Sequence, residues 1–173
     1  MDHTNARRLS DIADRAEILD CLNRYARGMD RHDRDLARSA YHDDAIDDHL
    51  GFSGPVDDFL DWAFTYQERG VRHQHYIGNH LAEIDGDSAH AETYFFFVAS
   101  PPDDDAPLSI YGGRYIDRLE RRDGRWAIVV RRLLVEWATS ADSLLPVGDL
   151  GVGGHIARDR TDCSYQRPLE VDP

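Results

Sequence analysis

Three histidines lie close together in a segment that is predicted to form a strand: His73, His75 and His80. His73 and His75 stand two residues apart, so their side chains point to the same face of a strand. An imidazole titrates near pH ~6.5, so either ring could act as a base. Together with a third ligand, the two rings could also bind a metal ion. The structural alternative is that one histidine packs in the sheet while the other forms a hydrogen bond at an edge.

Asp30 is a further candidate, because it falls at the predicted C-terminus of the first helix. A carboxylate at that position faces the negative end of the helix dipole, at a cost of roughly 0.3–1 kcal/mol. Sequences tend to break local rules of this kind at functional sites. The alternative is a solvated carboxylate in a chain that has 33 acidic residues.

Arg131 and Arg132 occupy the last predicted strand, where each alternates with mostly apolar residues. At least one guanidinium is therefore flanked by hydrophobic side chains, and it needs a carboxylate partner or an oxygen-bearing ligand. The pattern leaves both partners open, and it slightly favours an ion pair within the chain over a contact with substrate.

The elements that must position these residues divide the chain into two halves. Apolar residues recur at helical spacing in the first half and alternate as in strands in the second half. The spacing of Asp14 and Glu17 is that of a capping box, which places the start of the first helix there. A turn at 42–45 and a short strand at 45–50 precede the third helix. The longer helices and strands are predicted, in order, at 14–30, 33–41, 55–70, 71–84, 89–100, 108–119 and 125–138.

Helices followed by a meander of long antiparallel strands predict an α+β fold, with the helices packed on one face of a curved sheet. Gly112 and Gly113 inside a strand indicate a bulge or strong curvature. We expect one domain at residues 10–138. Residues 1–9 are polar and predict a flexible N-terminal arm, and residues 139–173 predict a C-terminal tail that covers a pocket or contacts a neighbouring subunit.

Composition excludes several classes of function. All 20 basic residues are arginine, which excludes Schiff-base lysine chemistry, a pyridoxal-phosphate enzyme and a P-loop. The formal net charge of −13 argues against nucleic acid and anionic membranes as partners. Two cysteines are too few for a disulfide scaffold or a cysteine-based zinc site. Because the chain has no signal-peptide pattern and no apolar run of about 18 residues, we expect a cytoplasmic protein.

Three motifs resemble the NTF2-like superfamily, and in particular its SnoaL-like and scytalone-dehydratase-like branch. They are Tyr25 followed five residues later by Asp30, the segment 72–78 (RHQHYIG) and the hairpin 119–126 (LERRDGRW). The resemblance covers about residues 10–138. It implies a cone-shaped, antiparallel or mixed sheet that encloses an apolar pocket together with about three N-terminal helices.

The resemblance implies a cofactor-free lyase, similar to bile acid 7α-dehydratase and hexachlorocyclohexane dehydrochlorinase. Such enzymes use an Asp–His pair in an apolar cavity, and Asp30 and His75 match that pair. Tyr25 and Arg131 match two further catalytic positions. The substrate-binding residues that we expect are His49, which adjoins the position of a pocket tyrosine, and three wall residues chosen by strand alternation: Phe95, Phe97 and Tyr115.

Two departures from the scytalone dehydratase pattern argue against scytalone as the substrate. Asp48 stands at the position of the pocket tyrosine, and Ala99 stands where that enzyme has a second functional histidine. We expect instead a hydrophobic ring compound that carries a hydroxyl group, such as an aromatic, a steroid or a terpenoid.

In the expected mechanism His75, oriented by Asp30, removes a proton beside a carbonyl or a leaving group. Tyr25 donates a hydrogen bond to the developing oxyanion or the departing hydroxyl, Arg131 holds a substrate oxygen, and water is eliminated without a cofactor or metal. The alternatives are a retro-aldol C–C lyase, a polyketide cyclase or isomerase, a non-catalytic binding module, and a metal-dependent hydrolase that uses His73 and His75. By analogy with the family we expect a homo-oligomer, with a trimer favoured over a dimer.

Overall fold

The computed structural model describes residues 3–67, 71–101, 106–142 and 157–168. Its main feature is a six-stranded sheet with the strand order β2-β1-β6-β5-β4-β3. Neighbouring strands are antiparallel except β1 and β6, which run parallel, so the sheet is mixed. The strands are β1 (Tyr41–His49), β2 (Phe52–Pro55), β3 (Arg72–Asp85), β4 (Ser88–Ser100), β5 (Leu108–Arg122) and β6 (Arg125–Ala141).

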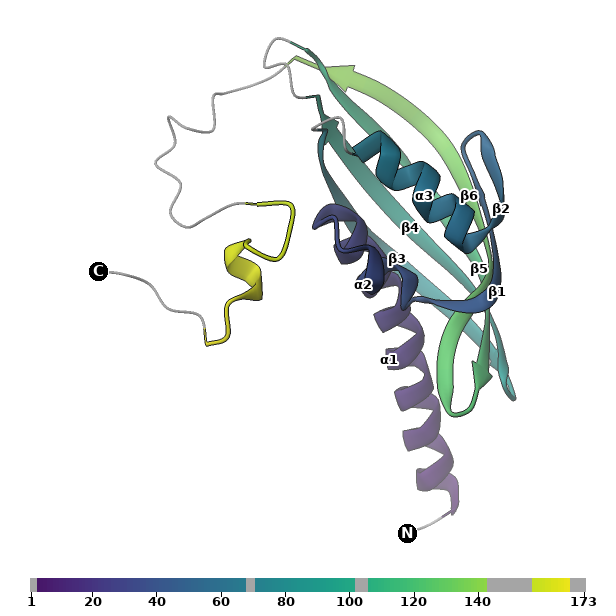
Figure 1. Cartoon of the computed structure of the whole chain (residues 1–173). Coiled ribbons are helices and arrows are strands. Elements are labelled where there is room, and N and C mark those ends of the chain that lie inside the picture. The colour runs from purple at the N-terminus through teal and green to yellow at the C-terminus, as the bar shows by residue number, and fades with distance from the viewer. Residues whose placement is uncertain (1–2, 68–70, 102–105, 143–156, 169–173) are drawn as a thin grey trace.

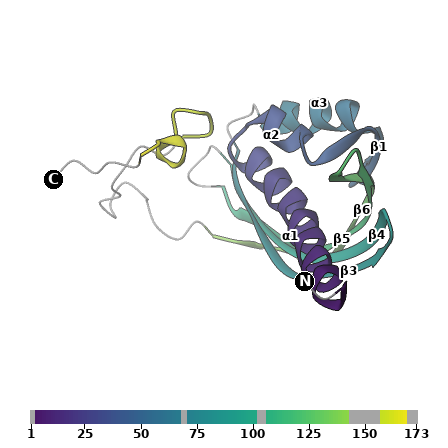
Figure 2. The ribbon, with the colours of Figure 1, turned by 90° about the horizontal axis from the view of Figure 1, so that it is seen from below.

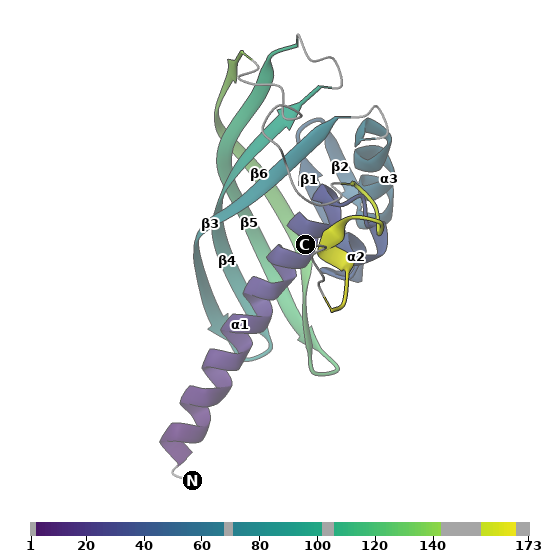
Figure 3. The same cartoon turned by 90° about the vertical axis from the view of Figure 1, so that its left-hand side faces the viewer.

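The sheet curves around the helices, which all lie on its concave face (Figures 1 and 2). Helix α1 (His3–Asp30) crosses this face, α3 (Val56–Gln67) packs on β1 and β2, and α2 (Arg34–Arg38) contacts both helices (Figure 3). The buried residues of α1 recur at helical spacing, as an amphipathic helix requires: Ile18, Cys21, Leu22, Tyr25 and Met29. The fold is therefore the predicted α+β cone. None of the described helices has the length and hydropathy needed to cross a bilayer.

The chain turns sharply after α1, and this turn sets the position of Asp30. A Cβ atom on Gly28 would lie 2.3 Å from the backbone nitrogen of Ala37, so α2 can pack this closely on α1 only against a glycine. His32 follows at a positive φ of 54°, in the left-handed region. The last residue of α1 is therefore held at a fixed place beside the sheet.

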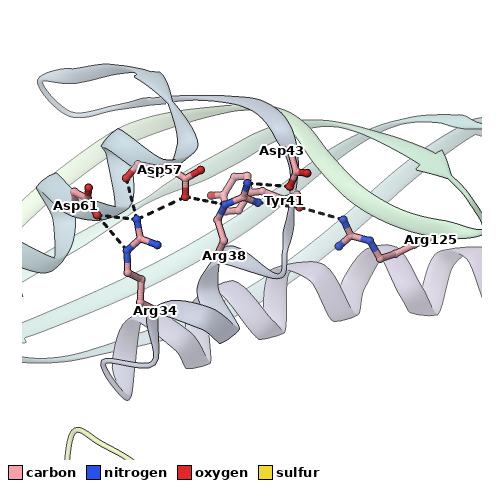
Figure 4. Close-up of polar contacts among 7 residues, drawn as sticks. All are labelled: Arg34, Arg38, Tyr41, Asp43, Asp57, Asp61 and Arg125. Atoms are coloured by element: carbon pink, nitrogen blue, oxygen red, sulfur yellow. Dashed lines mark hydrogen bonds and ion pairs between the residues drawn. The ribbon is translucent and has the colours of Figure 1, made fainter.

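Exposed ion pairs join α2 to α3 and β1 (Figure 4). Arg34 Nη2 lies 2.7 Å from Asp61, while Arg38 lies 2.9 Å from Asp57 through Nε and 3.1 Å from Asp43 through Nη2. Exposed pairs of this kind contribute about 0–1 kcal/mol each. Their main effect is therefore to orient α2 relative to its neighbours.

The irregularity predicted at Gly112 and Gly113 is confirmed, and the structure contains a second one in β3. The pairing of β5 with β6 shifts register between Gly112 and Gly113, and that of β3 with β4 shifts between Ile77 and His80. A Cβ atom on Gly113 would lie 1.9 Å from the carbonyl oxygen of Leu134, so the bulge needs a glycine. These bulges occur where the sheet bends around the helices.

The first helix starts earlier than predicted. Residues from His3 onward are helical, so the expected flexible arm at 1–9 is wrong for this segment. The side chains of residues 5–13 are exposed, and Leu9 and Ile12 are the only large apolar residues among them, so the pattern that predicts a buried helix face is weak there. Asp14 is not a cap: its Oδ1 accepts hydrogen bonds from Trp126 Nε1 at 2.9 Å and Arg121 Nη1 at 2.7 Å.

The segment 42–45 was predicted as a turn and instead belongs to β1. Its polar side chains alternate poorly with apolar ones. The residues on either side of it, Tyr41 and Ile46, pair in parallel with β6, which is distant in the chain. Local pattern carries no signal for such a distant partner. The short predicted strand at 45–50 is therefore the second half of β1, and the unpredicted strand β2 follows it before α3.

Candidate active site

Asp30 and His75 form a closely held pair between the end of α1 and the start of β3. Oδ1 of Asp30 lies 2.7 Å from Nδ1 of His75, and Oδ2 accepts the backbone N–H of His75 at 2.9 Å. A carboxylate has only acceptors, so Nδ1 carries the hydrogen and Nε2 holds the free lone pair. The side chain of His75 is only 8% exposed, and that of Asp30 is 14% exposed. Asp30 therefore fixes both the position of the strand and the tautomer of the ring.

Aromatic rings surround the imidazole of His75. Its centroid lies 4.7 Å from that of Phe97, 5.5 Å from His73 and 6.0 Å from Tyr25. Within the described part of the chain, Nε2 has no hydrogen-bond partner. The arrangement presents one basic nitrogen to an aromatic environment.

His73 lies on the same face of β3 but has a different role. Its Nε2 donates to the carbonyl oxygen of Met29 at 3.1 Å, and its Nδ1 lies 3.3 Å from Nη2 of Arg158. Burial, together with the nearby His75 and Arg158, lowers the pKa of His73 from 6.5 to about 4. His73 is therefore a neutral, structurally engaged ring, and His75 is the histidine that offers a free nitrogen.

Asp30, His73 and His75 also bring three potential metal-ligand atoms within 4.8 Å of one another. Two of the ring nitrogens are already engaged, since Nδ1 of His75 donates to Asp30 and Nε2 of His73 donates to Met29. A metal ion bound through these two nitrogens would have to replace both hydrogen bonds. The three residues therefore fit the hydrogen-bonded Asp30–His75 pair as it stands. They would fit a metal ion bound through these nitrogens only after the two hydrogen bonds are broken.

Arg131 is fully buried and forms an ion pair within the chain. Its Nε and Nη2 each lie 2.8 Å from a carboxylate oxygen of Asp117, which is also 0% exposed. Its guanidinium carbon sits 4.4 Å from the ring centroid of Tyr25 and 4.2 Å from that of Tyr115. Although burial alone lowers its pKa, the charge of Asp117 raises the pKa of Arg131 well above its usual value.

Of the two partners that the sequence left open for Arg131, the structure contains the carboxylate. The expected contact with a substrate oxygen is therefore replaced by an indirect role. Arg131 packs on the rings of Tyr25 and Tyr115 by cation–π contact, and Asp117 balances its charge.

Tyr25 and Tyr115 lie side by side, with ring centroids 5.8 Å apart. Burial is the main cause that raises the pKa of both phenols well above the usual range, so both remain protonated and can donate hydrogen bonds. The hydroxyls of the two residues have no hydrogen-bond partner within the described part of the chain. Tyr25 therefore suits the expected role of a donor to a substrate oxygen.

The predicted wall residues cluster around these tyrosines. Phe95 stacks on Tyr115 with centroids 4.8 Å apart, and Phe97 lies 5.9 Å from Tyr111. His49, the remaining candidate, stacks on Phe59 at 4.8 Å. Strand alternation could also have indicated Tyr111, which precedes Tyr115 by four residues in β5.

A pocket of about 400 Å³ opens in the seam between α1 and β3. Its lining includes both members of the dyad, so Asp30 and His75 adjoin space that a small molecule can enter. The lining is more polar than the predicted apolar pocket, because it includes Arg27 of α1 and Arg31, which directly follows that helix. The lining residues are Asn23, Ala26, Arg27, Asp30, Arg31, His75, Tyr76 and Ile77.

Residues 157–168 of the C-terminal segment dock beside this pocket. Arg31 donates to the carbonyl oxygen of Ala157 at 3.1 Å, and Arg27 lies 3.2 Å from Ser164 Oγ. Arg158 donates to the carbonyl oxygen of Val71. The rest of the predicted tail, at 143–156 and 169–173, lies outside the described residues. The described part thus contacts two arginines that line the pocket.

A curved mixed sheet closed by N-terminal helices, with polar side chains at the end of the first helix, defines an NTF2-like protein. The chain belongs to the SnoaL-like family, because the model of the SnoaL-like domain matches residues 10–132. No curated protein matches the chain.

Solved structures share this fold at low sequence identity. The hexachlorocyclohexane dehydrochlorinase LinA-type3 from Novosphingobium barchaimii LL02 is 19% identical, with a TM-score of 0.72 over 80% of this chain and 98% of that one. Kfla4162 protein from Kribbella flavida is 21% identical, with a TM-score of 0.68 over 75% and 95%. A provisionally assigned scytalone dehydratase from Novosphingobium aromaticivorans DSM 12444 is 16% identical, with a TM-score of 0.64 over 79% and 96%.

Sequence reasoning missed two buried carboxylates in the site, Asp47 and Asp117. Asp117 follows Tyr115 by two residues and shares its face of β5, so alternation with a predicted wall residue was an available signal. Asp47 lies in β1, whose position beside β6 is set by the parallel pairing that local pattern does not reveal.

Proposed function

We propose that the protein is a cofactor-independent lyase that eliminates water from a hydrophobic, hydroxylated ring compound. The observation that carries the proposal is the Asp30–His75 pair, with Nδ1 bound to the carboxylate at 2.7 Å and Nε2 unpartnered among the described residues. Membership of the SnoaL-like family, and a fold shared with a hexachlorocyclohexane dehydrochlorinase, support chemistry that acts on small molecules.

In the proposed reaction Nε2 of His75 accepts a proton from a carbon atom next to a carbonyl group. The electrons of the C–H bond form the new double bond as the C–O bond breaks. The departing hydroxyl group takes a proton from the imidazolium of His75 and leaves as water, which returns His75 to its neutral form. Asp30 stabilises the imidazolium that forms on His75. The low exposure of both side chains strengthens this interaction, because partial burial reduces screening by water.

Tyr25 donates a hydrogen bond to the oxygen on which negative charge develops. Its buried phenol is suited to this role, since burial raises its pKa and keeps it protonated. Arg131 lies behind the ring of Tyr25 and holds it in place. Phe95, Phe97 and Tyr115 supply apolar contact area for a ring-shaped substrate.

The test is turnover of a panel of phenolic, steroidal and terpenoid alcohols, followed by mass spectrometry for the loss of one water. His75→Ala and Asp30→Asn should each lower kcat by about 10²- to 10⁴-fold. His90→Gln is the matched control, because His90 is an exposed histidine on β4 that should not affect turnover. Far-ultraviolet circular dichroism checks that each variant is folded.

The panel also distinguishes the alternatives. Two product fragments would indicate a C–C lyase, and a product of unchanged mass would indicate an isomerase or cyclase. Binding without turnover would indicate a binding module. Loss of activity on treatment with a chelator, restored by a divalent metal, would indicate the metal-dependent hydrolase. Full activity in folded His75→Ala would refute the dyad.

A further inference from the structure

The pocket beside the Asp30–His75 pair contains two guanidinium groups that the proposed reaction does not use. Arg27 and Arg31 line this pocket together with the pair, and its volume is about 400 Å³. Small-molecule sites span about 300–1,000 Å³, so the pocket lies at the small end of that range. One ligand that fills it therefore contacts the arginines and the pair at the same time.

Arg27 is a cation without a counter-charge. The chain has 33 acidic residues for its 20 arginines, yet within the described residues Arg27 forms no ion pair. Its Nη2 lies 3.2 Å from Oγ and 3.4 Å from the carbonyl oxygen of Ser164, and its guanidinium carbon lies 4.7 Å from the ring centroid of Tyr165. In the same part of the chain Nε and Nη1 have no hydrogen-bond partner. The half-buried guanidinium is therefore held from one side and keeps two nitrogens for a ligand.

Arg31 also has donors to spare. Its Nη1 donates to the carbonyl oxygen of Ala157 at 3.1 Å and lies 3.6 Å from Oδ2 of Asp162, which is beyond hydrogen-bonding distance. The carboxylate of Asp162 is already occupied, because hydrogen bonds from Ser164 and Ala157 lower its pKa to about 2. Nε and Nη2 of Arg31 have no partner among the described residues.

The charges around the pocket leave one guanidinium uncompensated. Asp162 lies beside Arg31, and Asp30 lies within electrostatic reach of Arg158 from the docked segment 157–168. Each of these carboxylates thus has a cation near it, and Arg27 is left without one. A partly buried guanidinium of this kind favours a ligand with one negative charge.

We propose that the substrate of this pocket is a monocarboxylate, whose carboxylate group binds to Arg27 and Arg31. The inference rests on the proposed function and narrows its ring compounds to hydroxylated acids. The planar fork of a guanidinium matches the two oxygens of a carboxylate. Ala26 of α1 and Ile77 of β3 supply apolar lining for the rest of the molecule. Because His75 belongs to the same lining, the bound carboxylate sets which carbon of the substrate meets His75.

The first test measures binding without turnover. Benzoate and benzamide have the same ring and nearly the same shape, and only benzoate is charged. Isothermal titration calorimetry should give a Kd for benzoate that is about 10- to 100-fold lower, as expected for a hydrogen-bonded charge pair. Arg27→Gln, which keeps N–H donors and removes the charge, should abolish this preference. Arg8→Gln is the matched control, because Arg8 is an exposed arginine of α1 outside the pocket lining.

Two further measurements test the class of anion and its position. Phenyl phosphate is mostly a dianion above its second pKa of about 6, and it should bind no more tightly than benzoate. Tighter binding of phenyl phosphate would assign the pocket to phosphate esters and overturn the carboxylate. In proton NMR, benzoate should shift the imidazole signals of His75, which are identified by their absence in His75→Ala. Shifts that spare His75 would place benzoate elsewhere and overturn the proposal as well.

Turnover separates this inference from the proposed function. The panel is extended with hydroxylated acids and their primary amides, and kcat/KM should be about 10- to 100-fold higher for the acid of each pair. Arg27→Gln should raise KM for the acids with little change in kcat, because it removes binding that is equal in the ground and transition states. Higher kcat/KM for the amides would contradict the proposal.

The outcomes of binding and turnover are independent. Equal or undetectable binding of benzoate and benzamide overturns the carboxylate site, and so does a preference that survives in folded Arg27→Gln, even if the wild-type protein eliminates water. An Arg27-dependent preference for benzoate without elimination of water from any compound supports the carboxylate site and refutes the lyase. If Arg27→Gln does not fold, Arg31→Gln decides the question, since it should lower the preference for benzoate in the same way.

Discussion

The buried histidine His73 predicts a specific dependence of stability on pH. In the folded protein its pKa is lowered from 6.5 to about 4, because burial, His75 and Arg158 all disfavour the imidazolium. The unfolded chain therefore binds a proton at His73 across this interval, while the folded chain does not. Stability contributed by this site is complete above about pH 6.5 and is lost progressively as the pH falls toward about 4.

The magnitude follows from the size of the shift. One pKa unit corresponds to about 1.4 kcal/mol, so the full loss is roughly 3 kcal/mol. Between about pH 7.5 and about pH 5 the expected loss from His73 alone is about 2 kcal/mol. The substitution His73→Gln removes the titration and keeps a side-chain N–H that can donate to the carbonyl oxygen of Met29.

The assay is urea denaturation of the wild-type protein and His73→Gln at both pH values. Other groups also titrate in this range, so the informative quantity is the difference between the two proteins. The free energy of unfolding should fall by about 2 kcal/mol less in His73→Gln than in the wild type. His90→Gln should behave as the wild type does, because His90 is exposed. Equal pH dependence in the wild type and His73→Gln would refute the reasoning.

Two more predictions concern the buried ion pair and the outer face of the sheet. Asp117→Asn should lower the free energy of unfolding by about 3–5 kcal/mol, because it leaves the guanidinium of Arg131 buried without its counter-charge. The double variant Asp117→Leu/Arg131→Met should recover much of this loss in urea denaturation, and a double variant that is less stable than Asp117→Asn would contradict the argument. The convex face carries a row of exposed rings, with Phe96 lying 6.1 Å from Tyr76 and 5.8 Å from Trp137. If this row joins copies of the chain, light scattering should give the mass of a homotrimer and Phe96→Glu should reduce it; a monomeric wild-type protein would exclude the trimer.

Much of the fold could be predicted from local patterns. The alternation in the second half, with turns at Gly86 and Gly124, defines four long strands that pair in chain order, because short hairpins leave little choice of partner. The helical spacing from Ile18 to Met29 defines α1 and its end at Asp30. Two local patterns failed: residues 5–13 of α1 have few large apolar residues, and residues 42–45 of β1 lie between two positions that pair with β6.

The site divides in the same way. The proximity of Asp30 and His75 was expected from the family resemblance, whereas no local rule joins residues that are 45 positions apart. Arg131 needed a partner, but the choice of Asp117 depended on the register between β5 and β6, in which these two residues are directly opposed. Asp47 and His49 stand two residues apart in β1, so strand alternation places both side chains on one face, where they form a hydrogen bond. The cytoplasmic location stays a prediction.

The carboxylate of Asp30 holds the main chain of β3 and the imidazole of His75 at once. Side chains alternate faces along a strand, so a slip of β3 by one residue would place His75 on the outer surface and break both hydrogen bonds together. The correct register of β3 and the formation of the Asp30–His75 pair therefore occur together. A chain with β3 shifted by one residue would contain every residue of the site without the Asp30–His75 pair, so the activity of the proposed lyase would report the alignment of a strand.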